Sequence, residues 1–191
     1  MKTKMLATTI VFAALTVALN PAISGIGIPA PYAPYLIYGL WEIPIVAAFL
    51  LISPASAIMI SLVNATVLFA LFPGSLPTGP FYNLIAIFAM LLGLYLARRF
   101  IKRESTQQQK AVLKIAAAST ILGIILRVAL MTLVNYITLQ QPYPIGFGLD
   151  ELAVVATLPL TALFNATTVL YTIPIGEFVT RVIKSRLKIE N

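Results

Sequence analysis

Long apolar segments alternate along this chain with short stretches rich in proline, glycine or charged residues. Six apolar segments have about the length that a helix needs to cross the ~30 Å hydrocarbon core of a membrane. They cover residues 5–19, 36–52, 55–72, 81–97, 112–138 and 152–179. The alternation of apolar and polar residues that a membrane β-barrel requires is missing. The pattern therefore predicts an all-α membrane protein with six transmembrane helices.

The second and third of these helices come from one apolar run, residues 36–72, in which Glu42 is the only charged residue. A single helix of that length would measure about 55 Å, almost twice the thickness of the hydrocarbon core. Ser53 and Pro54 divide the run, and proline is tolerated in the first turn of a helix but not in its interior. We therefore expect two helices that meet at this pair.

The positions of the basic residues add an orientation. Of the 13 Lys and Arg residues, all but Arg127 lie at the two ends or in one central stretch: Lys2, Lys4, Arg98, Arg99, Lys102, Arg103, Lys110, Lys114, Arg181, Lys184, Arg186 and Lys188. The connections at 20–35, 73–80 and 139–151 contain none. Because basic loops stay on the cytoplasmic side of a membrane, both termini and residues 98–114 are predicted to be cytoplasmic.

The composition excludes several classes of protein. Only 10% of the 191 residues are charged, against about 25% in soluble domains. We therefore expect one integral membrane domain, residues 1–191, with several spans in the cell membrane. Cys and His are absent, which removes thiol chemistry and most transition-metal sites. There is no Walker A loop either, so we expect no enzyme activity, cofactor or metal.

The first 19 residues also have the basic start and apolar run of a signal peptide. We interpret them as an uncleaved helix, because an even number of spans places both basic ends on one side of the membrane.

Two charged residues lie inside the apolar segments, Glu42 in 36–52 and Arg127 in 112–138. A charge within the membrane is costly unless it finds a partner. Two interpretations stay open from the sequence. The two side chains can pair and hold helices together, or one or both can face a ligand in a cavity.

Polar residues and aromatic residues cluster at related depths in the predicted helices. Glu42, Asn83 and Asn135 fall in the outer halves of their predicted helices, and Thr161 lies early in the last one. Single residues of this kind commonly join helices. The aromatic residues near the same level are Tyr32, Tyr35, Tyr38, Trp41, Phe81, Tyr82, Tyr136, Tyr143 and Phe147. An interfacial belt explains most of them, but such a lining also suits a planar, hydrogen-bonding small molecule.

Several short sequences occur in a distinctive order. They are the alanine pair Ala14 and Ala18, the acidic-x-Pro segment at 41–45, the Pro-Thr-Gly at 77–79 followed by Asn83, and the Met-x-x-x-Asn-Tyr segment at 131–136. Together with the six-helix layout, they resemble the S components, or substrate-capture subunits, of energy-coupling factor (ECF) vitamin transporters. The resemblance covers essentially the whole chain and is closest to the riboflavin-type branch.

This resemblance implies a function. An S component captures its vitamin at the outer face, and a transmembrane coupling protein joins it to two ATPases, which hydrolyse the ATP. The pair Ala14 and Ala18 resembles the contact for the coupling protein, and the loop at 22–34 would act as the gate. The substrate-binding candidates are Glu42, Asn83, Arg127, Asn135 and Thr161, and riboflavin or another vitamin would be the ligand.

One segment departs from the riboflavin-type pattern. That branch typically reads Pro-Phe-Asn-x-x-Lys early in its last span, and the Asn and Lys contact the vitamin. This chain has Thr161 and Phe164 at those positions, and Asn165 lies one residue further, about 100° around the helix. Three other functions stay open from the sequence: a stand-alone transporter or channel, an integral membrane enzyme, and an assembly subunit.

Overall fold

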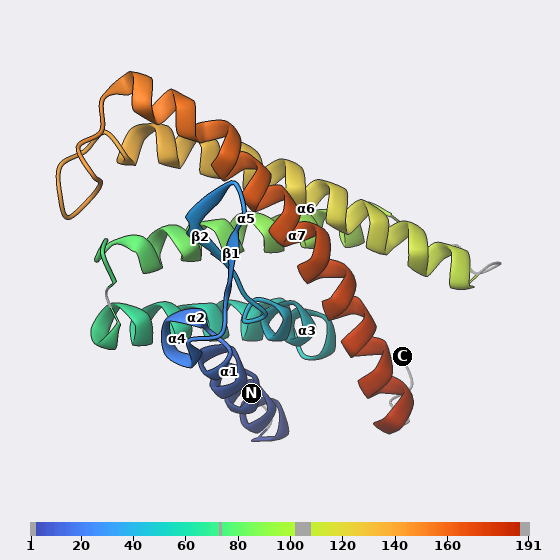
Figure 1. Cartoon of the computed structure of the whole chain (residues 1–191). Helices are drawn as coiled ribbons and strands as arrows, with labels where there is room; N and C mark the ends of the chain where they lie inside the picture. Colours follow the sequence, from blue (N-terminus) through green and yellow to red (C-terminus); the bar gives the residue numbers. More distant parts are fainter. Residues whose placement is uncertain (1–2, 73, 102–107, 188–191) are drawn as a thin grey trace.

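The computed structural model describes residues 3–72, 74–101 and 108–187 (Figure 1). Of the basic clusters, Lys2, Lys102, Arg103 and Lys188 lie outside the described residues. The described chain is mostly helical. Its helices are α1 (Thr3–Ala18), α2 (Pro21–Ser24), α3 (Ile43–Leu51), α4 (Pro54–Leu71), α5 (Gly79–Phe100), α6 (Gln108–Thr138) and α7 (Glu151–Leu187), and its strands are β1 (Ile28–Ala30) and β2 (Ala33–Tyr38).

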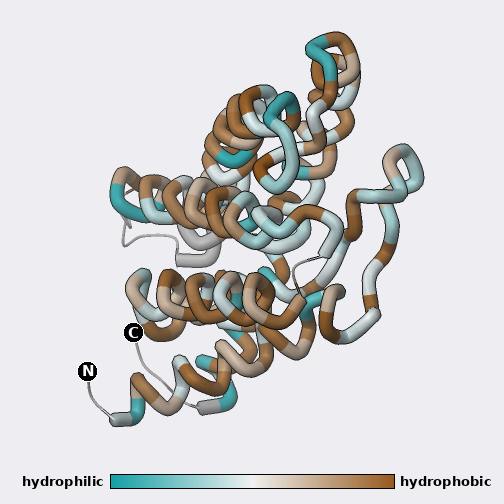
Figure 2. Tube along the Cα trace, turned by 90° about the vertical axis from the view of Figure 1, so that its left-hand side faces the viewer, coloured by the Kyte–Doolittle hydropathy of each residue, from teal (hydrophilic) through white to brown (hydrophobic). Residues whose placement is uncertain are grey.

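Most of the apolar segments form helices, as the pattern predicts, with the exception of the first part of 36–52. Four helices in the described part of the chain are long and apolar enough to cross a membrane, namely α4, α5, most of α6 and α7, and α1 is a shorter apolar helix. Apolar residues dominate these helices, whereas polar residues are more frequent near helix ends and in connections (Figure 2). The division at Ser53 is confirmed, because α3 ends just before it and its Oγ accepts a hydrogen bond from Ser56 N at 3.1 Å, which caps α4.

The predicted helix over 36–52 is wrong in its first part. Residues 36–38 belong to β2, and the helix that follows, α3, contains only 9 residues. β2 pairs with β1 in an antiparallel hairpin in which Ile28 lies opposite Tyr38. The segment 22–34, expected as a loop, accordingly contains most of α2, all of β1 and the start of β2. A short apolar run fits a strand and a buried helix equally well, and this explains the error.

Small residues allow the helices to pack closely. A Cβ on Gly93 of α5 would lie 2.5 Å from the backbone N of Gly123 on α6, so these two backbones touch. A Cβ on Gly176 of α7 would likewise meet the Val46 side chain of α3. α5 thus packs along both α4 and α6, and α7 covers α6 and α3 (Figure 1). The buried core between them includes Ile45, Ile60, Ile87, Met90, Leu94, Val169 and Ile173.

The helix ends separate into two sides. The turn between α3 and α4, the start of α6 and the end of α7 lie toward the right of Figure 1, and α1 begins near the centre at the bottom and runs away from that side. The connections at 74–79 and 139–150 lie on the left. The described basic residues at helix ends belong to the first side: Lys4, Arg98, Arg99, Lys114, Arg181, Lys184 and Arg186. There, Arg98 at the end of α5 also forms an ion pair with Glu177 of α7.

Candidate functional site

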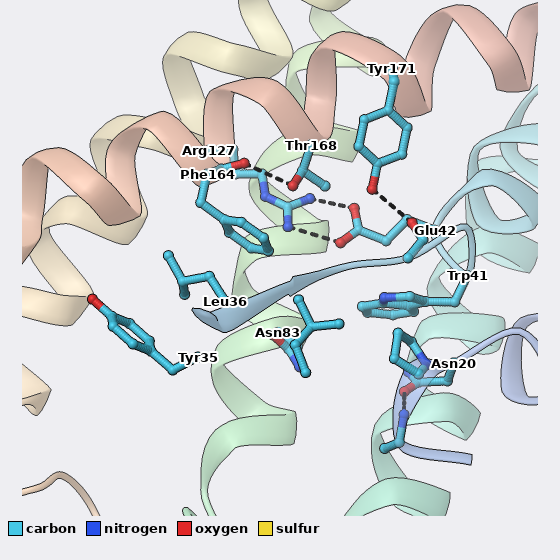
Figure 3. A pocket seen from close by; sticks show the side chains of 14 residues that line it. Asn20, Tyr35, Leu36, Trp41, Glu42, Asn83, Arg127, Phe164, Thr168 and Tyr171 are labelled. Carbon is cyan, nitrogen blue, oxygen red and sulfur yellow. Dashed lines mark hydrogen bonds and ion pairs between the residues drawn. The ribbon is translucent and has the colours of Figure 1, made fainter. Parts of the chain in front are cut away.

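A cavity of about 340 Å³ lies between the hairpin, the start of α3 and the helices α5, α6 and α7 (Figure 3). Its lining is Asn20, Pro21, Ala22, Tyr35, Leu36, Ile37, Gly39, Trp41, Glu42, Asn83, Arg127, Phe164, Thr168 and Tyr171. The innermost lining residues are almost inaccessible, since Glu42 and Arg127 are each 3% exposed and Trp41 is 7% exposed. Tyr35 and Asn83 are exposed, so they form a rim above a buried floor.

The floor contains an ion pair between Glu42 and Arg127. Glu42 immediately precedes α3, and Arg127 lies in α6. Arg127 Nη2 donates to Glu42 Oε1 at 2.9 Å, and Nη1 donates to Glu42 Oε2, so the pair is bidentate. Figure 3 shows the two side chains facing each other, with Phe164 on one side and Trp41 on the other. Of the two interpretations that the sequence left open, the structure confirms that the residues pair. It also places both residues in the lining of the cavity, and contact of either with a ligand stays a prediction.

Asn165 binds the Nε edge of the Arg127 guanidinium, which Glu42 leaves free. Its Oδ1 accepts a hydrogen bond from Arg127 Nε at 2.9 Å, and its Nδ2 donates to the carbonyl of Thr161 at 2.8 Å. Asn165 is 5% exposed. Arg127 Nη1 also approaches Met90 Sδ at 3.9 Å. Every nitrogen of the guanidinium therefore has a protein partner, because Nε donates to Asn165 and both Nη atoms donate to Glu42. The orientation of Arg127 is fixed by groups on three other elements.

Hydroxyl groups tie the hairpin to α7 above this floor. Tyr38 at the end of β2 and Thr167 are joined by a hydrogen bond of 2.6 Å, and the Tyr38 ring packs against Phe164 with a centroid distance of 4.7 Å. Tyr171 OH donates to the carbonyl of Gly39 at 2.7 Å. Tyr32, in the turn of the hairpin, hydrogen-bonds to Tyr38, and burial together with this contact raises the pKa of Tyr32 above its usual value.

Several uncharged polar groups of the lining have no partner within the described part of the chain. Asn83, Tyr35 and Trp41 make no side-chain hydrogen bond, and Asn20 uses only its Oδ1. Thr168 and Tyr171 donate hydrogen bonds from their hydroxyl groups to backbone carbonyls. Asn83 offers both a donor and an acceptor and Trp41 offers an indole N–H, whereas the Tyr35 hydroxyl points away from the other lining side chains (Figure 3). Within the described residues, no three acidic side chains gather as a metal site would require.

Of the substrate-binding candidates from the sequence, the structure brings Glu42, Asn83 and Arg127 together around the cavity. Asn135 and Thr161 are not among the lining residues. Asn135 is partly exposed on α6, and Thr161 is 7% exposed on α7, where its hydroxyl donates to the Leu158 carbonyl at 3.0 Å. Contact of these two residues with a ligand stays a prediction.

The two alanines proposed as a partner contact lie on an open face of α1. Ala14 and Ala18 are exposed, whereas Thr9, Ala13 and Thr16 form the face of α1 that is buried in the protein. Thr9 Oγ1 hydrogen-bonds to Ser56 Oγ at 3.1 Å, which joins that buried face to α4.

The sequence interpretation did not select Phe164, Thr168, Tyr171 and Asn165 as ligand or site residues. One signal for them existed in the sequence. Asn165, Thr168 and Thr172 repeat at intervals of three and four residues in an apolar helix, which places them on one face, and all three are buried. Phe164 and Tyr171 flank that face.

The fold of the chain is similar to a known one. A solved structure described as "Structure and mechanism of the S component of a bacterial ECF transporter" matches with a TM-score of 0.75 and 22% sequence identity. The match covers 99% of this chain and 100% of that one. The chain has the fold of an ECF S component. No protein-family model matches the chain, and no curated protein does.

Proposed function

We propose that this chain is the substrate-binding S component of an ECF-type importer and captures a vitamin or a similar small molecule at the outer face of the cell membrane. The observation that carries the proposal is the cavity itself. It is open at its rim, buried at its floor and lined by aromatic and amide groups, in a chain whose fold matches an S component over 99% of its length.

The lining favours a planar ligand that forms hydrogen bonds. Trp41, Phe164, Tyr171 and Tyr35 present aromatic surface, and Asn83 offers an amide at the rim. Riboflavin or another vitamin has these properties. Phe164 lines the cavity at the position where the riboflavin-type pattern has a lysine, which favours a ligand other than riboflavin.

The proposed orientation places both termini and the basic helix ends in the cytoplasm, with the hairpin and cavity outside. The absence of Cys in the natural chain makes a direct test available. Ser75→Cys in the connection after α4 and Ser185→Cys near the end of α7 both introduce exposed thiols. In intact cells, a membrane-impermeant maleimide should label only the first. Labelling of Ser185→Cys from outside would contradict the orientation.

The exposed alanine face of α1 is the proposed contact for the transmembrane coupling protein, which two ATPases drive. A large side chain there would keep another helix from approaching. Ala14→Trp or Ala18→Trp should therefore abolish ATP-dependent uptake into cells that express all subunits, with ligand binding unchanged, because α1 does not line the cavity.

Ile125→Trp is the matched control, because Ile125 is exposed on α6, away from α1, and should tolerate a large side chain. Equal loss of binding and uptake in the alanine variants would show that this face is not a partner contact. Uptake by the purified chain alone in liposomes would favour a stand-alone transporter instead.

A further inference from the structure

We propose that Glu42 sets the charge selectivity of the cavity: it neutralises Arg127, so that the cavity accepts uncharged solutes and rejects solutes that carry a carboxylate or phosphate. This inference rests on the proposed function, because it concerns the ligand of the same cavity. Neither the fold nor the similarity to an S component determines which charge the bound solute carries.

The contacts of Arg127 carry the argument. An arginine at the floor of a cavity would ordinarily attract an anion, because its N–H groups match a carboxylate or phosphate. Here Glu42 already occupies that edge with both of its oxygens, and Asn165 occupies Nε. Glu42 and Arg127 are the only charged residues of the lining, so the floor has no net charge.

An anionic solute would meet two penalties at this floor. If it displaced Glu42 from Arg127, a carboxylate that is 3% exposed would lose its partner, and an unpaired buried charge is the costly state. If it left the pair intact, its own charge would lie close to the Glu42 carboxylate and be repelled. An uncharged solute avoids both penalties.

An uncharged solute also finds the groups that it needs. Asn83 can donate and accept and Trp41 can donate, and neither side chain has a hydrogen-bond partner in the described protein. The ion pair then forms a fixed polar part of the cavity surface, since Asn165 binds Nε of the guanidinium while Glu42 binds its two Nη atoms.

The first test uses wild-type protein and pairs of molecules that differ in charge and share a ring system: riboflavin and FMN, nicotinamide and nicotinate, biotinamide and biotin. Isothermal titration calorimetry gives the dissociation constant of each. In any pair that binds, the uncharged member should bind about 10-fold tighter or more, which corresponds to about 1.4 kcal/mol. Equal or tighter binding of the anionic member overturns the inference and leaves the proposed function standing.

The second test removes the charge of Glu42 and keeps its shape. In Glu42→Gln, Arg127 is no longer neutralised, so the preference should shift toward the anionic member by about 10-fold or more. Glu177→Gln is the matched control, because it removes the acidic partner of the Arg98–Glu177 ion pair, which lies outside the cavity lining. An unchanged preference in Glu42→Gln, or the same shift in Glu177→Gln, overturns the inference.

A third test needs no knowledge of the ligand and covers the case in which Glu42→Gln folds poorly. Glu42→Ala leaves a space beside Arg127 that acetate can fill. Acetate should raise the unfolding temperature of Glu42→Ala and leave that of Arg127→Ala unchanged. Equal effects on both variants overturn the inference. If no member of any pair binds wild-type protein, the ligand lies outside these three ring systems, and the acetate test alone decides the inference.

Discussion

Two ion pairs in this chain have the same chemistry and different surroundings. Glu42 and Arg127 join the start of α3 to α6, and their side chains are 3% and 4% exposed. Glu177 and Arg98 join α7 to the end of α5. The Glu177 side chain is 7% exposed, but that of Arg98 is 38% exposed. The first pair is closed off from bulk water except through the cavity, whereas the second reaches water through its arginine.

The difference indicates different roles. Arg98 lies in the last turn of α5 beside Arg99, on the side of the molecule that carries the basic helix ends. There, Arg98 binds Glu177 of α7, and the desolvation penalty of this ion pair is small because the arginine remains partly hydrated. The buried pair pays a full desolvation penalty, which its bidentate geometry and Asn165 offset. Such a costly arrangement at a cavity floor is typical of a functional site.

The largest effect should come from removing one member of the buried pair. Arg127→Met leaves Glu42 buried without a partner, so it should lower the free energy of unfolding by about 3–5 kcal/mol. The double variant Glu42→Gln/Arg127→Met should lose less, because no unpaired charge remains. Denaturant unfolding of detergent-solubilised protein measures both. Additive losses would contradict direct coupling between the two residues.

The next effect concerns the rim of the cavity. Asn83→Ala should weaken ligand binding by about 1–3 kcal/mol, because a polar group of the bound ligand loses its partner.

Asn135→Ala distinguishes between two expectations about ligand binding. The position of Asn135 outside the lining predicts little change, whereas the resemblance to the riboflavin-type branch predicts a loss like that of Asn83→Ala. Calorimetric titration of both variants, with circular dichroism as a check on folding, distinguishes them.

The smallest effect should come from the second ion pair. Arg98→Ala should lower stability by about 1 kcal/mol, because water can replace the exposed side chain beside Glu177. Ligand binding should not change, since neither residue lines the cavity. The same denaturant titration measures the loss. A loss of stability as large as that of Arg127→Met would contradict the claim that the exposed pair contributes less to stability than the buried pair.

Most helices could be predicted from the sequence because their signals are local. Apolar length and the Ser53-Pro54 pair placed the helices from α4 onward and the end of α3 within about four residues, except for the end of α7. The predicted span ends at 179, whereas α7 continues to Leu187. The hairpin could not be predicted in this way. Pro29 and Pro34 argue against a strand from sequence alone, yet both lie in the hairpin, where a two-stranded sheet consists only of edge strands.

The site was predictable only in part, since its contacts join distant residues. Burial cost identified Glu42 and Arg127 as unusual, but 85 residues separate them, and no periodicity shows that they meet. Asn165 was set aside because it lies one residue beyond Phe164, about 100° around the helix. That rotation is what directs it toward Arg127. Tertiary packing decides such cases.

The claim that this cavity captures a small molecule is tested most directly by native mass spectrometry of protein purified from its own membranes. Wild-type protein should carry one vitamin-sized molecule that is released on unfolding. Asn83→Trp, which places a large side chain at the exposed rim and leaves the Glu42–Arg127 pair untouched, should carry none. A wild-type chain without any bound molecule, or the same molecule retained equally by Asn83→Trp, would contradict the account.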